Sequence, residues 1–399
     1  MQFESLNSEM VGLLRGTVER RLPRIRQLRH ELHRAAEPSM GEWETAKLIE
    51  TELIDLGLNF RHGLAGTGIL AGLGGVGEGG RVILRADMDA VPVRESSGAP
   101  YHSRDPAYSH ACGHDGHLAI VLGAGMVLRE LSPRWRGEVQ LLFQPGEETA
   151  SGARAMIETG VLCGLRADAI FCLHAWPGLP VGHVACREGA MMAACDSFDL
   201  EVFGRGGHGA RPHLAVNPLN TLAPICQKFL TMNTEQRVVS PCRLQVGSSN
   251  NVIADRGTLA GTLRTLDEDV RQASMREMKE IAERVARSHG TTARLSFETG
   301  CPVVVGDPGL HRLLVETVGG LLGGSRVHRL ESPSMGSEDF GFFLEHLPGL
   351  MFRLGMGEGC EELHNPGFDF NDDALANGVL LMSALALRVC GLLNSQGQS

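Results

Sequence analysis

Hydrophobic residues recur at helical spacing near the start of the chain and then gather into short continuous runs. The spacing predicts two helices, over residues 11–35 and 43–56, each with one apolar side. A longer apolar run over 118–131 predicts a third helix. Short apolar runs bounded by glycine or polar residues are typical of buried strands, and they cover residues 68–73, 82–86, 139–143 and 169–173. This alternation of strands and helices favours an α/β domain with a largely parallel sheet.

Apolar and polar residues begin to alternate near residue 187. Such alternation is typical of strands with one face in water, and it covers 198–203 and parts of 242–247 and 257–265. Helices with one apolar side are predicted beside these strands, over 217–232 and 267–288. Together these elements predict a smaller α+β domain.

The α/β pattern resumes after residue 300 and closes with a long apolar helix over 374–393. We therefore predict one α/β catalytic domain made of residues 1–186 and 300–399, with the smaller α+β domain, 187–299, inserted into it. A chain of 399 residues is long enough for two such domains.

The charge balance limits the partners that the chain can bind. With 37 basic and 47 acidic residues the net charge is −10, which argues against nucleic acid and anionic membranes, because both attract basic surfaces. Residues 1–21 contain no apolar run long enough for a signal peptide, and no stretch approaches the roughly 20 apolar residues of a membrane span. Ten cysteines without a Cys-x-x-Cys pair do not suggest a disulfide framework, so we predict a cytoplasmic protein.

The segment His110–His117 holds three histidines, a cysteine and an aspartate. Gly113 and Gly116 favour a turn there, which lets Cys112 and His114 point to one place. Thiolate sulfur and imidazole nitrogen are the preferred ligands of zinc-like ions. The alternative interpretation is a polar turn with one buried cysteine and solvated histidines.

Two adjacent carboxylates, Glu147 and Glu148, follow the predicted strand 139–143 and a Pro-Gly turn. On their own they would be interpreted as a solvated surface pair. Beside a metal site, one carboxylate can bind the ion while the other accepts a proton from water as a general base.

His174 follows the strand 169–173, and His364 lies in a turn-rich loop. Each alone is more often structural than a ligand. Taken together, the candidate ligands are Cys112, His114, Glu148, His174 and His364. They exceed the needs of one tetrahedral ion and suit two divalent ions that share a bridging ligand, either Cys112 or a water. The thiolate favours Zn²⁺, with Mn²⁺, Co²⁺ and Ni²⁺ as alternatives.

A glycine-rich loop in the inserted domain, Gly204–His213, carries His208 and Arg211. One interpretation is a flexible hairpin. The other is a polar arm over the substrate, in which His208 donates to a developing oxyanion and Arg211 or Arg264 binds a substrate carboxylate.

Several motifs occur in order along nearly the whole chain. They are Arg29–His33, Leu84–Pro92, His110–His117, Gln144–Glu148, Gly204–His213, Asn251–Ile253, Ser334–Phe340 and Leu363–Pro366. This series resembles the M20 metallopeptidase family, and specifically its amidohydrolase branch of hippurate, aminobenzoyl-glutamate and auxin-conjugate hydrolases and N-acyl-amino-acid deacylases. The resemblance implies a dinuclear catalytic domain and an inserted lid domain through which the chain forms homodimers or higher oligomers.

The resemblance also implies individual roles. Cys112, His114, Glu148, His174 and His364 match the metal ligands. Glu147 matches the general base, and Asp89 matches the acid that orients a ligand. His208 matches a lid histidine that reaches the partner subunit's active site in dimeric relatives, and we add Asn251 to the predicted substrate-binding residues.

Two positions depart from the wider family. Asp87 stands where peptidases of the wider family carry a metal-binding histidine. The resemblance implies that Cys112 and His114 supply ligands instead, as in the amidohydrolase branch. Ala254 stands where many relatives have proline, which bears on substrate contacts rather than on the chemistry.

These observations predict a hydrolase that cuts the amide bond of an N-acyl amino acid into a carboxylic acid and a free amino acid. Two alternatives remain at this stage: a dipeptidase or carboxypeptidase of the same fold, and a non-catalytic metal-binding module. Acetyl, benzoyl, long-chain acyl and indole-acetyl groups are all open as the acyl part.

Overall fold

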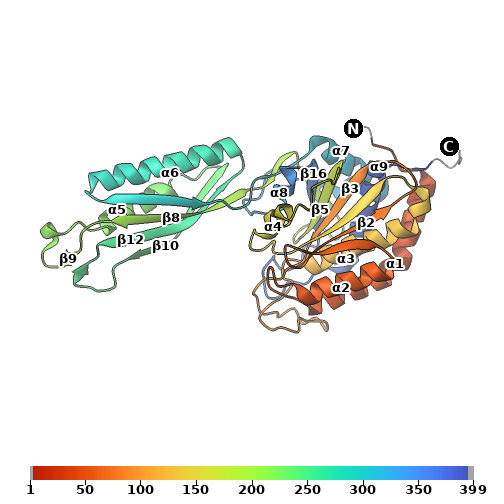
Figure 1. Cartoon of the computed structure of the whole chain (residues 1–399), viewed down its shortest axis with the longest axis horizontal. Coiled ribbons are helices and arrows are strands. Elements are labelled where there is room, and N and C mark those ends of the chain that lie inside the picture. Colours follow the sequence, from red (N-terminus) through yellow and green to blue (C-terminus); the bar gives the residue numbers. More distant parts are fainter. Residues whose placement is uncertain (1–2, 394–399) are drawn as a thin grey trace. The chain divides into compact units, whose positions relative to one another are not determined.

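The computed structural model describes residues 3–393, which divide into two compact units (Figure 1). Unit 1 contains residues up to 189 together with 305–331 and those from 342 onward, whereas unit 2 contains 190–304 and 332–341. The ends of the predicted catalytic domain, residues 1–2 and 394–399, lie outside the described residues. The role of the predicted inserted domain as a lid stays a prediction.

Unit 1 is built on an eight-stranded sheet whose centre is parallel. In spatial order its strands are β1 (Asn59–Leu64), β2 (Gly68–Gly74), β4 (Glu138–Gln144), β3 (Arg81–Asp87), β5 (Ala169–Trp176), β16 (Gly349–Gly355), β6 (Val184–Cys186) and β15 (Val327–Arg329). The pairs β4–β3, β3–β5 and β5–β16 are parallel, while β1–β2 and β2–β4 are antiparallel. The α/β fold with a largely parallel centre is confirmed.

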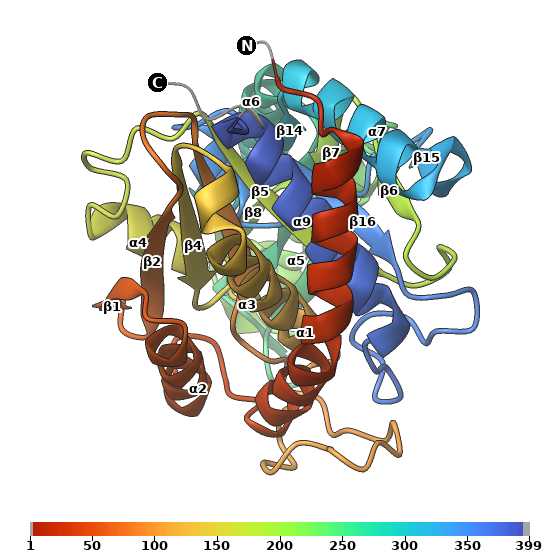
Figure 2. The same cartoon turned by 90° about the vertical axis from the view of Figure 1, so that its right-hand side faces the viewer.

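Long helices cover this sheet. The helices α1 (Ser8–Arg34), α3 (His114–Glu130) and α9 (Leu375–Cys390) pack against one another (Figure 2), and α3 and α9 also contact β3 and β5. The remaining helices of this part of the chain are α2 (Trp43–Asp55), α4 (Gly152–Glu158), α7 (Pro308–Leu322) and α8 (Gly341–Leu344). Leucine, valine and alanine side chains from these helices and the sheet form one buried core.

The helix α9 corrects one expectation. Among residues 3–393, one helical stretch, Asp372–Cys390, is long and apolar enough to pass for a membrane span, with a mean hydropathy of 1.5. The prediction that no stretch approaches such a length was therefore wrong. However, 78% of that apolar window is buried inside the protein, as expected for the central helix of a core.

The start of α3 corrects a second expectation. The helix was predicted from residue 118, with a turn through His117, but it begins at His114 directly after Gly113 (φ 87°). Gly116 lies inside the first helical turn. A Cβ atom at this position would lie 2.2 Å from the Phe370 ring. The glycine therefore permits close packing of a distant segment, a role that local sequence does not reveal.

Unit 2 is an antiparallel sheet covered by two helices. Its strands lie in the order β10 (Arg237–Val246), β12 (Arg256–Thr265), β8 (Ala194–Phe203) and β13 (Thr292–Glu298). The helices α5 (Leu219–Leu230) and α6 (Glu268–Ser288) pack on it around a small apolar core. The short strands β9 (Gly207–His208) and β11 (Val252–Ile253) form a separate ribbon. β7 (Gly189–Met192) and β14 (Val304–Gly306) lie where the chain passes between the units.

Candidate metal centre

Polar side chains gather where three neighbouring parallel strands of unit 1 end. Asp87 ends β3 and Asp89 follows it, Glu147 and Glu148 follow β4, and His174 lies in β5. Functional groups collect at this edge of parallel sheets, because the carboxyl ends of the strands meet there. His174 was predicted just after its strand, but β5 continues to Trp176.

Cys112, His114 and His174 form a buried group of potential ligands within 4.8 Å of one another. The Sγ atom of Cys112 lies 3.5 Å from His174 Nε2. His174 Nδ1 lies 2.7 Å from the carbonyl oxygen of Ala175, and His114 Nδ1 lies 2.8 Å from that of Asp89. Because a carbonyl only accepts, both histidines carry hydrogen on Nδ1 and present Nε2 toward the group.

Cys112, Glu148 and His364 form a second group within the same distance limit. His364 comes from a loop between β16 and α9, where it adopts a left-handed backbone conformation (φ 65°). Its backbone N–H donates to the carbonyl of Ala111 at 2.7 Å, and its Nε2 lies 3.3 Å from Glu148 Oε1. The structure thus brings all five candidate ligands together, and Cys112 belongs to both groups.

Asp89 holds the loop that carries the two glutamates. Its Oδ1 accepts the backbone N–H of Glu147 at 3.1 Å, and its Oδ2 accepts that of Glu148 at 3.0 Å and the Ser39 hydroxyl at 2.6 Å. Buried Glu42, which the sequence interpretation missed, accepts the N–H of Gly146 in the same loop at 2.9 Å. Nothing in the local sequence marks this contact, because 104 residues separate the two.

Asp87 and His117 also lie in the centre, although neither was among the predicted site residues. His117 Nε2 accepts the backbone N–H of Ala175 at 2.8 Å, so its Nδ1 donates to Asp87 at 2.7 Å. Arg85 also donates to Asp87, at 2.8 Å. Both nitrogens of His117 are thus engaged within the protein, which suits a supporting role better than a ligand role. The sequence feature that could have identified His117 was its place in the histidine-rich segment His110–His117.

The electrostatics favour a cation among these groups. Burial opposes charge on His114, but Asp87 and Asp89 outweigh it and raise its pKa to about 10. Burial and then Glu148 and Glu147 raise the pKa of the Cys112 thiol well above its usual value. Burial lowers the pKa of His174 to about 3, which keeps its ring neutral. The centre therefore has an excess of carboxylate charge, and a metal cation would favour the thiolate of Cys112.

Two buried atoms show that the residues fit a metal. His114 Nε2 and Glu148 Oε1 lie 3.8 Å apart. Among residues 3–393 His114 Nε2 has no hydrogen-bond partner, and Glu148 Oε1 has only the His364 Nε2 atom at 3.3 Å, without the geometry of a hydrogen bond. Buried polar atoms of this kind are costly unless something binds them. Sulfur, imidazole and carboxylate donors that converge on one place are the set expected for zinc-like ions.

The other predicted site residues lie in unit 2. His208, Arg211 and Asn251 are exposed, and His208 and Asn251 line one cavity of about 550 Å³ beside the β9–β11 ribbon. Arg264 lies near the end of β12, where it donates to the carbonyl of Met335 at 2.8 Å. The ribbon strand β11 ends at Ile253, and β12 begins shortly afterwards at Arg256. Arg264 lies eight residues further along β12, roughly 27 Å from Arg256. The structure does not bring these four residues together.

Comparison with known proteins identifies the origin of this arrangement. The model of peptidase family M20/M25/M40 matches residues 83–388. The chain belongs to this family. A crystal structure described as a dinuclear metal-binding peptidase of the M20 family, from Bacillus subtilis, superposes with a TM-score of 0.84 at 32% identity, covering 93% of this chain and 99% of that one. This M20 chain is thus a metal-dependent hydrolase with a dinuclear metal-binding fold.

Curated relatives within the family have different activities. The chain is 35% identical to N-acetylcysteine deacetylase from Bacillus subtilis, over 92% of this chain and 97% of that protein. It is 33% identical to thermostable carboxypeptidase 2 from Saccharolobus solfataricus, over 95% and 99% respectively. Membership of M20 therefore establishes the reaction class, metal-dependent hydrolysis, and leaves the substrate to be inferred.

Proposed function

We propose that this chain hydrolyses the amide bond of N-acyl amino acids and releases a carboxylic acid and a free amino acid. The observation that carries the proposal is the convergence of Cys112, His114, Glu148, His174 and His364 beside a second carboxylate, Glu147. The printed activity of the N-acetylcysteine deacetylase relative supports this substrate class.

Two divalent ions would be held by the five ligands. Cys112 belongs to both groups of potential ligands, so its sulfur could help to hold either ion. The thiolate favours Zn²⁺, with Mn²⁺, Co²⁺ and Ni²⁺ as alternatives. When bound, such ions polarise the amide carbonyl and lower the pKa of water toward neutrality.

Glu147 acts as the general base in this proposal. Its Oε2 lies 4.0 Å from the ligand atom His114 Nε2, while its backbone is held by Asp89. The carboxylate accepts a proton from the attacking water and then passes it to the nitrogen of the leaving amine. One side chain thus serves both halves of the reaction.

The residues of unit 2 are proposed to serve two different active sites. His208 and Asn251 lie at the β9–β11 ribbon, which precedes the start of β12 in the chain, and Arg264 lies near the far end of β12, roughly 27 Å from the start of that strand. An N-acyl amino acid with a short acyl group is too small to contact both. This separation supports a homodimer in which His208 acts on the substrate of the partner subunit. A cytoplasmic location remains part of the proposal.

A carboxypeptidase is the second candidate function, favoured by the likeness to thermostable carboxypeptidase 2. A dipeptidase is a further alternative, although such an enzyme has to recognise a free amine. A non-catalytic metal-binding module is disfavoured, because it has no use for a base beside the ligands.

A substrate panel tests the proposal. Protein stripped with a chelator and reconstituted with Zn²⁺, Mn²⁺, Co²⁺ or Ni²⁺ is assayed with N-acetyl, N-benzoyl, N-indole-acetyl and long-chain N-acyl amino acids, with free dipeptides, and with longer N-blocked peptides. We expect turnover of N-acyl amino acids that disappears without metal. Preference for free dipeptides would indicate a dipeptidase, and preference for longer peptides a carboxypeptidase.

A further inference from the structure

Arg29 is a buried cation that the proposed ligands and base do not use. It belongs to the Arg29–His33 motif on α1, and its side chain is 0% exposed. Its Nη1 lies 3.3 Å from Asp115 Oδ2 and 2.6 Å from Asp369 Oδ1, and it also donates to the carbonyl of Phe370 at 3.2 Å. A buried guanidinium keeps its charge and binds carboxylates in a fixed geometry.

The segments that Arg29 joins both carry proposed metal ligands. Asp115 follows His114 in the first turn of α3, and Asp369 lies in the segment that follows His364. His33 supports the same carboxylate, because its Nδ1 lies 2.8 Å from Asp115 Oδ2. Arg29 therefore links the start of the metal-binding helix to the loop of His364.

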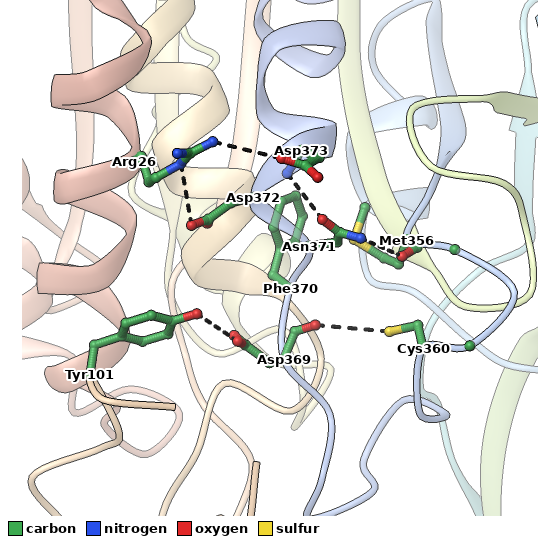
Figure 3. Close-up of a pocket in the computed structure, with 11 residues that line it drawn as sticks. Arg26, Tyr101, Met356, Cys360, Asp369, Phe370, Asn371, Asp372 and Asp373 are labelled. Atoms are coloured by element: carbon green, nitrogen blue, oxygen red, sulfur yellow. Dashed lines mark hydrogen bonds and ion pairs between the residues drawn. The ribbon is translucent and has the colours of Figure 1, made fainter. Parts of the chain in front are cut away.

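A cavity of about 610 Å³ is lined by Arg26 of α1 and by residues 369–373 (Figure 3). Polar contacts border it: the Tyr101 hydroxyl donates to Asp369 at 2.6 Å, and Arg26 lies 3.5 Å from Asp372 and 3.7 Å from Asp373. At this border, ion pairs and a hydrogen bond help to position the segment, in addition to the buried Phe370 ring.

His364 depends on such support more than the other ligands do. Its side chain is 52% exposed, whereas Cys112, His114 and His174 are buried. Two further contacts hold its loop: the N–H of His364 donates to Ala111, just before α3, and the Phe370 ring packs on Gly116 in α3. Arg29 adds a charged contact, to Asp369, to these two.

We propose that Arg29 is a positioning residue that places His364 against Cys112 and Glu148, and so determines how tightly one of the two ions is held. Arg29 touches neither ion nor substrate in this role. The inference rests on the proposed ligand set. It predicts unequal effects on the two ions, because Cys112, His114 and His174 have their own buried partners.

The test is stepwise removal of Zn²⁺ by a competing chelator, with the bound zinc measured at each step. Asp369→Ala removes the shortest contact between the loop and Arg29, 2.6 Å long, while Arg29 keeps Asp372 of the same segment at 2.9 Å and Asp115 at 3.3 Å as partners. Asp373→Ala is the matched control, because it makes the same change four residues along at a side chain that is 81% exposed and pairs with Arg26. Arg29→Lys keeps a charge but lacks the planar fork.

We expect Asp369→Ala and Arg29→Lys to bind one zinc ion about 10-fold more weakly or worse, with the other ion as in the wild type. Asp373→Ala should bind both ions as the wild type does. Thermal melting confirms that each variant is folded, and Asp369→Ala alone carries the test if Arg29→Lys does not fold.

Other outcomes overturn the proposal. Unchanged affinity for both ions in folded Asp369→Ala would show that the tie is dispensable, and equal weakening of both would show a general loss of stability. The assay needs no substrate, so a wrong substrate assignment does not affect it. A wild-type chain that binds fewer than two zinc ions would instead overturn the ligand set itself.

Discussion

The metal centre of unit 1 and the glycine-rich loop of unit 2 differ in how their functional side chains are held. In the metal centre, His114 and Asp89 are fully buried, and each makes hydrogen bonds to backbone groups. In the loop, His208 and Arg211 are exposed. Buried polar groups must be satisfied, so the geometry of the first region largely follows from its own contacts. The second region acquires a defined role only when a substrate or partner meets it.

The largest effect is expected at the base of the metal centre. Glu147→Gln removes the group that accepts the proton while keeping the shape of the side chain. Turnover should fall by about 10²–10⁴-fold, while the zinc content stays at that of the wild type. Steady-state kinetics and metal analysis on the same preparation measure both quantities.

Glu148→Gln is the matched control for that variant. It makes the same chemical change one residue along, at a proposed ligand, and should lower zinc affinity as well as turnover. Full activity in Glu147→Gln would remove Glu147 from the role of base. Equal zinc loss in both variants would mean that the two carboxylates do not have separate roles.

The unit 2 loop should show a smaller effect of a different kind. If His208 donates to the oxyanion, His208→Ala should lower kcat by about 10²–10³-fold without changing zinc content. His213→Ala, at an exposed histidine of the same loop, should leave kcat unchanged. Equal kcat values for the two variants would show that His208 has no special part in the reaction.

Mixed subunits test whether His208 serves the active site of its own subunit or that of the partner. Mixing His208→Ala chains with Glu147→Gln chains creates one complete site per heterodimer only if His208 acts on the partner subunit. Recovery of activity to a substantial fraction of wild type after subunit exchange is the expected result. Activity that stays at the level of the separate variants would place His208 and Glu147 in the same subunit's site.

The same contrast explains what the sequence could predict. The ligand types followed from Cys112, Glu148 and His174, and the strands that precede Glu148 and carry His174 followed from the apolar runs, because a strand pattern and a donor type are local properties. The roles of Glu42 and Asp87 were missed, because their partners are set by packing between distant segments. Gly116 was assigned to a turn for the same reason, since its close neighbour, Phe370, lies far along the chain.

The hydropathy of α9 did not distinguish a membrane span from a helix of the protein core. A helix that is apolar all round suits both a membrane and the interior of a protein, and only the packing of Asp372–Cys390 within unit 1 distinguishes the two. In unit 2 the residue types suggested substrate contacts, but the separation of His208 from Arg264 depends on which strand carries each. That information comes from the fold.

The smallest predicted effect concerns Asp89, which contacts the ligand loop through hydrogen bonds. Its two oxygens accept the N–H groups of Glu147 and Glu148, so Asp89→Asn turns an amide donor toward one of those donors. Zinc affinity should fall by about 10–100-fold, and excess zinc should restore most of the turnover. Ser39→Ala removes only the hydroxyl donor to Asp89 and should have a weaker effect. If Asp89→Asn instead loses turnover that zinc does not restore, Asp89 acts on the base or the substrate rather than on the ligand loop, because a carboxylate that only holds that loop influences the reaction through metal binding.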